Sequence, residues 1–157
     1  MRKVVSMNDL IPLMEEQMQH DGEVSFTPKG NSMLPMLRNN VDTVVLGKAE
    51  SKLKKYQVAL YVRDNGQYVL HRVVKTDGGS YVMRGDNQFV NEPGIRDNQI
   101  IGVVHSFIRK GKRYTCDNKR YIIYCKVWTA TVGLRKGIRK CCRFAGKVKR
   151  KILRVNK

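Results

Sequence analysis

One segment of the 157-residue chain places a serine in a glycine-started turn that also contains a proline. Residues 30–37 read GNSMLPML, with Ser32 two positions after Gly30 and three before Pro35. Such a turn would hold the serine at a rigid surface with its hydroxyl projecting, where a neighbouring base could activate it as a nucleophile. A serine between glycine and proline is more often an ordinary loop residue, so this segment alone does not establish catalysis.

A histidine that could serve as the base lies in residues 69–74, which read VLHRVV and are typical of a strand. Strand alternation places His71 on the same face as Val69 and Val73, with Arg72 on the opposite face. An imidazole on such a β-branched face is commonly a hydrogen-bonded structural residue. It can also be a general base, because its ordinary pKa of about 6.5 needs almost no adjustment at neutral pH.

The third segment, residues 83–92, contains Gly85-Asp86-Asn87. This tripeptide is typical of a tight turn, because Gly and Asn tolerate positive φ and Asp caps the turn.

Taken in order, the three segments resemble the catalytic domain that type I signal peptidases share with the self-cleaving LexA-type repressor proteases. The resemblance covers roughly residues 24–108. His71 stands where the usual bacterial signal peptidases and the repressor proteases carry lysine, so the chain is similar to the endoplasmic-reticulum type, which has His-Arg-Val. The matching elements are the Ser-Met-x-Pro box at 32–35, the strand pair 41–46 and 57–62, His71-Arg72-Val73-Val74, Gly85-Asp86-Asn87 and the closing strand 100–104.

The resemblance implies a serine peptidase in which Ser32 is the nucleophile and His71 the general base. The backbone N–H of Ser32 would hold the oxyanion. Signal peptidases commonly carry a second serine where this chain has Gly30, so the oxyanion hole would depend on backbone donors, with Asn31 as a further candidate. The remaining residues of the boxes, expected to position the site, are Met33, Pro35 and Gly85.

An acidic residue is expected to orient the histidine, by the same resemblance. Glu92 is the candidate and Asp86 its rival, and the sequence does not decide between them. The substrate would be an extended peptide or protein segment that pairs with a strand edge, with small residues beside the cut. The alternative is a non-catalytic module of the same fold that binds peptides or a membrane surface. We expect no cofactor and no metal.

These residues must be positioned by a mainly β fold. We expect a LexA/signal-peptidase-like antiparallel domain between two helical segments. We expect an N-terminal helix in 1–22, the catalytic domain in 23–115 and a basic helical tail in 116–157. Within the domain, turn residues separate short strands, as in antiparallel hairpins. The expected strands are 23–27, 42–46, 58–62, 68–74, 81–83 and 100–105.

The tail carries an apolar stripe at helical spacing, with Lys and Arg on the rest of the wheel. Glycines within it favour two shorter helices over one straight rod. Residues 119–157 could dock on an anionic membrane surface, or their stripe could pack against the β domain, and the sequence does not decide between these two hypotheses. Nucleic-acid binding is less favoured, because no stacking-aromatic motif accompanies the charge. The stripe comprises Tyr124, Val127, Thr131, Leu134, Ile138, Cys141, Ala145, Val148 and Ile152.

The formal charge of +18 is concentrated in the tail, where residues 121–157 hold twelve Lys or Arg and no acid.

No window of the sequence approaches the ~20 apolar residues of a membrane-spanning helix. At the N-terminus, acidic residues interrupt the segment that would be a continuous apolar run in an export signal. About 22 residues before the β domain are too few for a helix-turn-helix module, which disfavours gene repression. Four irregularly spaced cysteines suit neither a disulfide framework nor a metal site. We therefore expect a cytoplasmic protein, which would be peripheral at the inner membrane face if the tail docks there.

Overall fold

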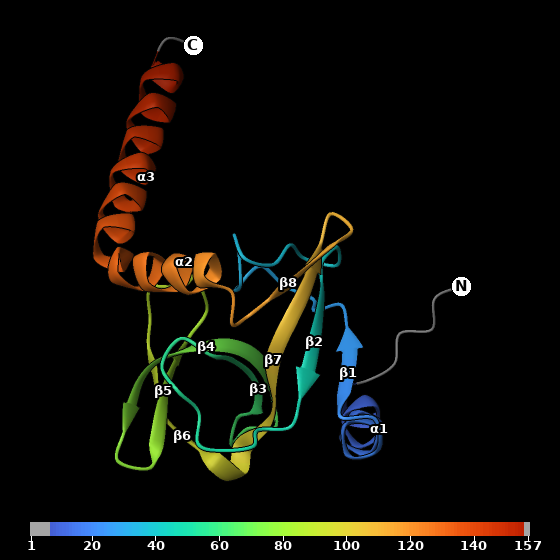
Figure 1. The fold of residues 1–157 in the computed structure, drawn as a ribbon. Coiled ribbons are helices and arrows are strands. Elements are labelled where there is room, and N and C mark those ends of the chain that lie inside the picture. Colours follow the sequence, from blue (N-terminus) through green and yellow to red (C-terminus); the bar gives the residue numbers. More distant parts are fainter. Residues whose placement is uncertain (1–6, 156–157) are drawn as a thin grey trace.

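The computed structural model describes the backbone of residues 7–155 and the side chains of residues 9–144. Its centre is an eight-stranded antiparallel sheet, and three α-helices flank the sheet (Figure 1). The mainly β class predicted from the sequence is confirmed. The strands are β1 (Glu23–Phe26), β2 (Thr43–Gly47), β3 (Val58–Val62), β4 (Tyr68–Asp77), β5 (Ser80–Arg84), β6 (Glu92–Arg96), β7 (Ile100–Arg109) and β8 (Lys112–Thr115). The helices are α1 (Met7–His20), α2 (Lys119–Ala130) and α3 (Val132–Val155), with a short 3-10 turn at Asp97–Gln99.

The strand order is β1-β2-β7-β3-β4-β5-β6, and β8 pairs with the far end of β7. The hairpin of β3 and β4 carries the predicted base. Ala59 pairs with His71, and Tyr61 pairs with Val69. Because residues two apart share a face, Tyr61 lies on the same face as His71 and diagonally next to it.

Two apolar clusters lie on the two faces of the sheet. One contains Met14 and Met18 of α1 together with Leu60 and Leu70 of the hairpin. The other contains the neighbours of His71 on its own face, among them Tyr61 and Val73. A central strand buried on both faces is rigid, and this rigidity allows the hairpin to hold a side chain in a defined place.

Two strands, β6 and β8, were not expected from the sequence. Pro93 and Gly94 suggest a turn, but both lie inside β6. Proline is tolerated there because β6 is an edge strand, whose outer N–H groups need no partner.

The C-terminal segment forms two helices, as predicted, but the break falls at Thr131 and not at a glycine. Gly133 and Gly137 lie within α3. In Figure 1, α2 lies across one end of the sheet and α3 extends away from it. Within the described residues, no helix is both long enough and apolar enough to cross a membrane.

Candidate active site

Ser32 lies in a turn that follows β1 and is anchored in the core. The N–H of Leu34 donates to the carbonyl of Asn31 at 3.3 Å, and the N–H of Leu37 donates to Met33 at 3.0 Å. The side chains of Met33 and Leu37 are buried in the cluster below the turn. This anchoring leaves Ser32 half-buried at the surface of the turn.

The donors around Ser32 differ in their availability. The N–H of Gly30 donates to Asn39 Oδ1 at 2.8 Å, so it is not free for an oxyanion. Gly30 contributes its φ of +113°, which other residues rarely adopt. In the described part of the chain, nothing accepts a hydrogen bond from the backbone N–H of Ser32. The Ser32 N–H is therefore available as a donor.

Two other predicted positioning residues contribute mainly through their backbone. Asn31 is exposed, and its carbonyl accepts a hydrogen bond from Asn87 Nδ2 at 3.1 Å. Pro35 is also exposed, and its carbonyl accepts from the Arg109 guanidinium. Both contacts tie the serine turn to distant elements of the domain.

His71 is buried, and its Nδ1 lies 3.2 Å from the hydroxyl of Tyr61. That hydroxyl donates its single proton to Glu92 Oε2 at 2.7 Å, since a carboxylate can only accept. The Tyr61 oxygen must then accept from Nδ1, so the proton of the neutral imidazole resides on Nδ1. This leaves the lone pair of Nε2 free to accept a proton.

Glu92 is held in place by Arg63, whose Nε and Nη2 donate to its two oxygens at 2.6 Å each. Burial raises the pKa of Glu92, but the hydrogen bonds from Arg63 and Tyr61 outweigh this effect, and the net pKa is lowered. Glu92 Oε2 lies 3.9 Å from His71 Nδ1, so the carboxylate reaches the imidazole through Tyr61. Burial and the bond to Glu92 raise the pKa of Tyr61, which keeps its proton.

Burial also sets the protonation of the histidine. It lowers the pKa of His71 to about 4, although the nearby Glu92 carboxylate opposes the shift. The imidazole is therefore neutral at neutral pH, the form that a general base requires.

Gly85 brings the serine turn and the histidine together. A Cβ on this residue would lie 2.7 Å from the Ser32 carbonyl oxygen and 3.0 Å from His71 Nε2. The next residue but one, Asn87, donates its N–H to the same Ser32 oxygen at 2.8 Å. The sequence suggested positive φ in this tripeptide, but none of its residues has it. Gly85 is required because the chains approach closely, not because of the turn.

Asp86 does not contact the histidine, because it forms a buried ion pair with Arg72 on the opposite face of β4. Arg72 Nε and Nη2 donate to the two carboxylate oxygens at 2.8 and 2.7 Å. Tyr124 of α2 donates to Asp86 Oδ2, and Trp128 donates to the Asp86 carbonyl at 2.8 Å. Of the two rival carboxylates, Glu92 is the one connected to His71, and Asp86 attaches α2.

Ser32 and His71 line one cavity of about 220 Å³. In the described structure no hydrogen bond joins the Ser32 hydroxyl to the imidazole. Further lining residues come from the segment after β1 and from the start of β4, among them Pro28, Lys29, Val69 and Leu70. The cavity is thus lined by two segments that are distant in the sequence.

Tyr61 and Arg63 are functional candidates that the sequence reasoning missed. Strand alternation puts Tyr61 and Arg63, two positions apart, on one face, and in the folded chain the Tyr61 face is the one that carries His71. The missing information was the register of β3 against β4, which sequence alone does not provide.

No protein-family model matches this chain, and a search of curated proteins also finds no match. All four cysteines are free thiols. Within the described residues, no three His, Cys, Asp or Glu side chains are arranged to hold a metal ion.

Proposed function

We propose that this protein is a serine endopeptidase of the signal-peptidase/LexA-type β fold, with Ser32 as nucleophile and His71 as general base. The observation that carries the proposal is the orientation of His71. Its Nδ1 is tied through Tyr61 to Glu92, and its Nε2 lies against Gly85, whose other neighbour is the Ser32 carbonyl. Glu92 and Tyr61 are positioning residues in this scheme.

In the first half-reaction, Ser32 Oγ attacks the carbonyl carbon of the substrate peptide bond while its proton passes to His71 Nε2. The carbonyl π electrons move to oxygen, and the Ser32 N–H donates to the resulting oxyanion. The imidazolium then carries protons on both nitrogens. Its Nδ1–H remains bonded to Tyr61, which Glu92 holds in place.

Collapse of the tetrahedral intermediate breaks the C–N bond, and His71 gives its proton to the leaving amine. The product is an ester between Ser32 and the N-terminal part of the substrate. Water then attacks the ester with His71 again as the base, which releases the acid and restores the serine. The small cavity supports small side chains beside the scissile bond.

The test is cleavage of a peptide library, followed by mass spectrometry. Ser32→Ala and His71→Ala should each reduce turnover to background, and the double variant should be no worse, because the two groups act as a unit. Ser51→Ala, at an exposed serine, is the matched control and should keep full activity. Turnover that survives Ser32→Ala would disprove the proposal.

One observation favours a second candidate function, a non-catalytic peptide-binding module. The Ser32 hydroxyl and His71 make no hydrogen bond in the described structure, although free enzymes often show looser contacts than their substrate complexes. A binding module would retain peptide affinity in Ser32→Ala, measured by calorimetry, while the unaltered protein would cleave none of the library.

A further inference from the structure

The helix α3 is strongly basic. Its sequence contains ten Lys or Arg and no Asp or Glu. Figure 1 shows α3 leading away from the sheet, and its Lys136, Arg139, Lys140 and Arg143 are exposed. Charge of one sign on a projecting helix favours an anionic partner.

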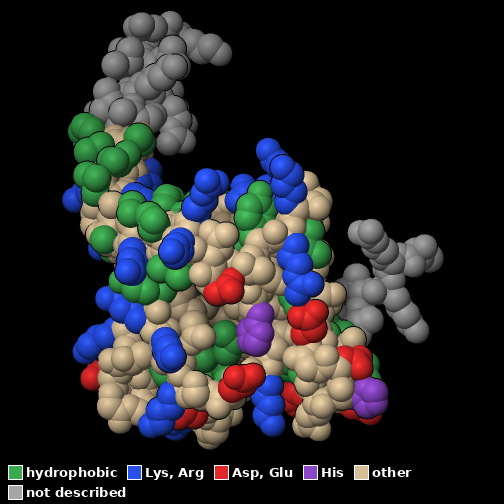
Figure 2. All heavy atoms as spheres, viewed as in Figure 1, with side chains coloured by type: hydrophobic (Ala, Val, Ile, Leu, Met, Phe, Trp, Pro, Cys, Tyr) green, Lys and Arg blue, Asp and Glu red, His purple; other side chains and the backbone are tan. Residues whose placement is uncertain are grey.

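The same helix exposes large apolar side chains. Leu134, Ile138 and Phe144 are 67%, 55% and 70% exposed. On α2, Ile123 and Val127 are 61% and 56% exposed. Figure 2 shows apolar side chains at the surface along both helices. We call these five residues the apolar face; of the predicted stripe, Ala145, Val148 and Ile152 lie outside the described side chains.

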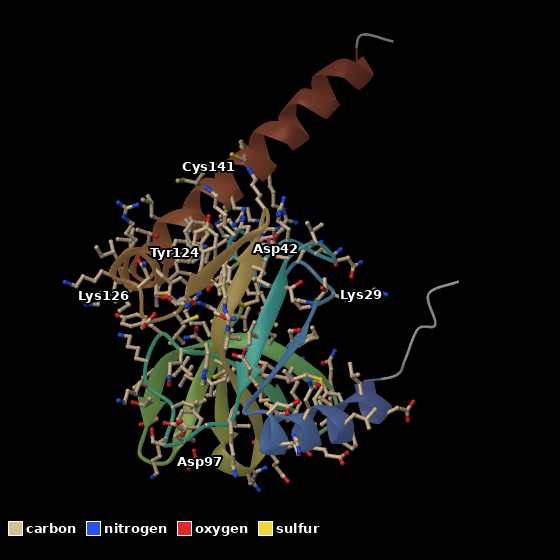
Figure 3. The ribbon with its side chains drawn as sticks, turned by 45° about the vertical axis from the view of Figure 1, so that its right-hand side comes forward. Lys29, Asp42, Asp97, Tyr124, Lys126 and Cys141 are labelled. Carbon is tan, nitrogen blue, oxygen red and sulfur yellow. The ribbon has the colours of Figure 1, made fainter. Side chains whose placement is uncertain are left out.

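The apolar face lies away from the contacts that fasten the helices to the sheet. Tyr124 and Trp128 of α2 point toward Asp86, whereas Lys126 is exposed, and Figure 3 shows Tyr124 and Lys126 on different sides of the helix. Arg135, in the first turn of α3, donates to the Asp86 carbonyl at 3.1 Å and stacks on Trp128. The start of α3 is therefore fixed to the β domain while its apolar face stays free.

We infer that the apolar face and the basic residues beside it dock the protein on an anionic lipid surface. An amphipathic helix of this kind lies in the interface, with apolar side chains in the headgroup layer and bases against anionic headgroups. Nucleic acid would account for the bases but not for the exposed Leu, Ile and Phe. A second copy is disfavoured, because it would bring two strongly basic helices together. This inference is independent of the proposed peptidase activity.

The test is sedimentation of the full-length Ser32→Ala protein with two kinds of vesicle. One is made of phosphatidylcholine alone, and the other also contains ~30% phosphatidylserine, which gives its surface a negative charge. We expect binding to the anionic vesicles and at least tenfold weaker binding to the neutral ones. The variant L134S/I138S/F144S should bind the anionic vesicles at least about tenfold more weakly, since these side chains supply the buried apolar area.

Two further variants test whether binding depends on the positive charge of α3 or on positive charge anywhere on the protein. K136Q/K140Q/R143Q should weaken binding roughly a hundredfold, because each neutralised base costs about fivefold. K48Q/K52Q/K55Q removes the same charge from exposed positions of the β domain and should bind like the parent. Unfolding is monitored by circular dichroism, and all substituted positions are exposed.

Four results would overturn the inference. One is equal binding to neutral and anionic vesicles, and another is undiminished binding by L134S/I138S/F144S. The third is a lipid-free dimer by light scattering that this variant abolishes, which would make the face a self-association surface. Tight binding to RNA that the apolar substitutions do not change, without vesicle binding, would assign the helix to nucleic acid.

Discussion

At the scale of single residues, the tautomer of His71 follows from the single hydroxyl proton of Tyr61. Because Tyr61 has one hydroxyl proton and Glu92 needs it, the imidazole must donate through Nδ1, and Nε2 is left as the acceptor beside the serine turn. A direct carboxylate–imidazole contact would produce the same tautomer. Here a buried tyrosine transmits the orientation, and Glu92 remains half-buried beside Arg63.

Tyr61→Phe tests this transmission. It removes the acceptor for Nδ1–H and the donor to Glu92, so the ring loses its preferred orientation. We expect kcat to fall on the order of a hundredfold with KM little changed. The acid limb of the pH profile should move to lower pH, because the imidazolium loses a stabilising dipole.

The control is Tyr81→Phe, which alters a tyrosine that donates to Asp97 away from the cavity. It should leave kcat and the pH profile unchanged. Equal losses in both variants would mean that the substitution acts through packing and not through the imidazole.

The depressed pKa of His71 predicts a specific loss of stability in acid. Its pKa of about 4 in the folded chain lies below 6.5, so the unfolded chain binds the proton more strongly. The contribution to the free energy of unfolding is complete above pH 6.5 and is lost as the pH falls through 4. The loss amounts to roughly 3 kcal/mol over this window.

Urea unfolding at pH 4 to 7 measures this effect. His71→Gln should flatten the curve of unfolding free energy against pH, whereas His105→Gln, at an exposed position, should follow the parent protein. If the His71→Gln curve runs parallel to that of the parent, burial does not depress the pKa as described.

At the scale of elements, the segment between β5 and β6 joins three parts of the site. It contacts the serine turn through Asn87, and its Gly85 lies against His71, while Asp86 binds both Arg72 and α2. The edge strand β6, which follows, begins with Glu92. The relative position of Ser32 and His71 is thus set by one short connection.

Gly85→Ala tests the close approach. The added methyl would collide with the Ser32 backbone and His71 Nε2, so the two groups must separate. We expect kcat/KM to fall on the order of a hundredfold. Gly133→Ala, where a Cβ meets nothing within 4 Å, is the matched control and should stabilise α3 slightly without changing activity. Full activity of Gly85→Ala would show that the approach is not needed.

At the scale of the whole molecule, α2 belongs to the folded body although its sequence looks like a charged tail. Arg72 and Asp86 are almost completely buried, and part of their cover is α2, which contributes Tyr121, Tyr124 and Cys125. These three side chains pack on the ion pair and hydrogen-bond to it, so α2 is part of the folded core.

Two truncations separate the helices. Deletion of 136–157 keeps α2 and Arg135 and should change the melting temperature little. Deletion of 119–157 removes the packing and hydrogen bonds of Tyr121, Tyr124 and Cys125 and should lower the free energy of unfolding by about 3–5 kcal/mol. Chemical unfolding followed by circular dichroism measures both. Equal stability of the two shortened chains would show that α2 is not part of the folded unit.

Sequence alone was sufficient for local features. Alternation and turn residues predicted the mainly β class, an N-terminal helix, most strands and the division of the tail into two helices, though not the position of the break, because these depend on neighbours a few positions apart. The resemblance singled out Ser32, His71, Gly85 and Glu92. That Ser32 and His71 line one cavity, with Gly85 packed against both, is a property of the folded chain.

Only the tertiary structure decided the partners. Which carboxylate serves His71, the insertion of Tyr61 between them, the strand nature of residues 92–96 and the docking of α2 on Asp86 all depend on register and packing between distant segments. Such contacts are set by the burial of whole faces and not by local preference. The hydrophobic periodicity of the sequence therefore does not predict them.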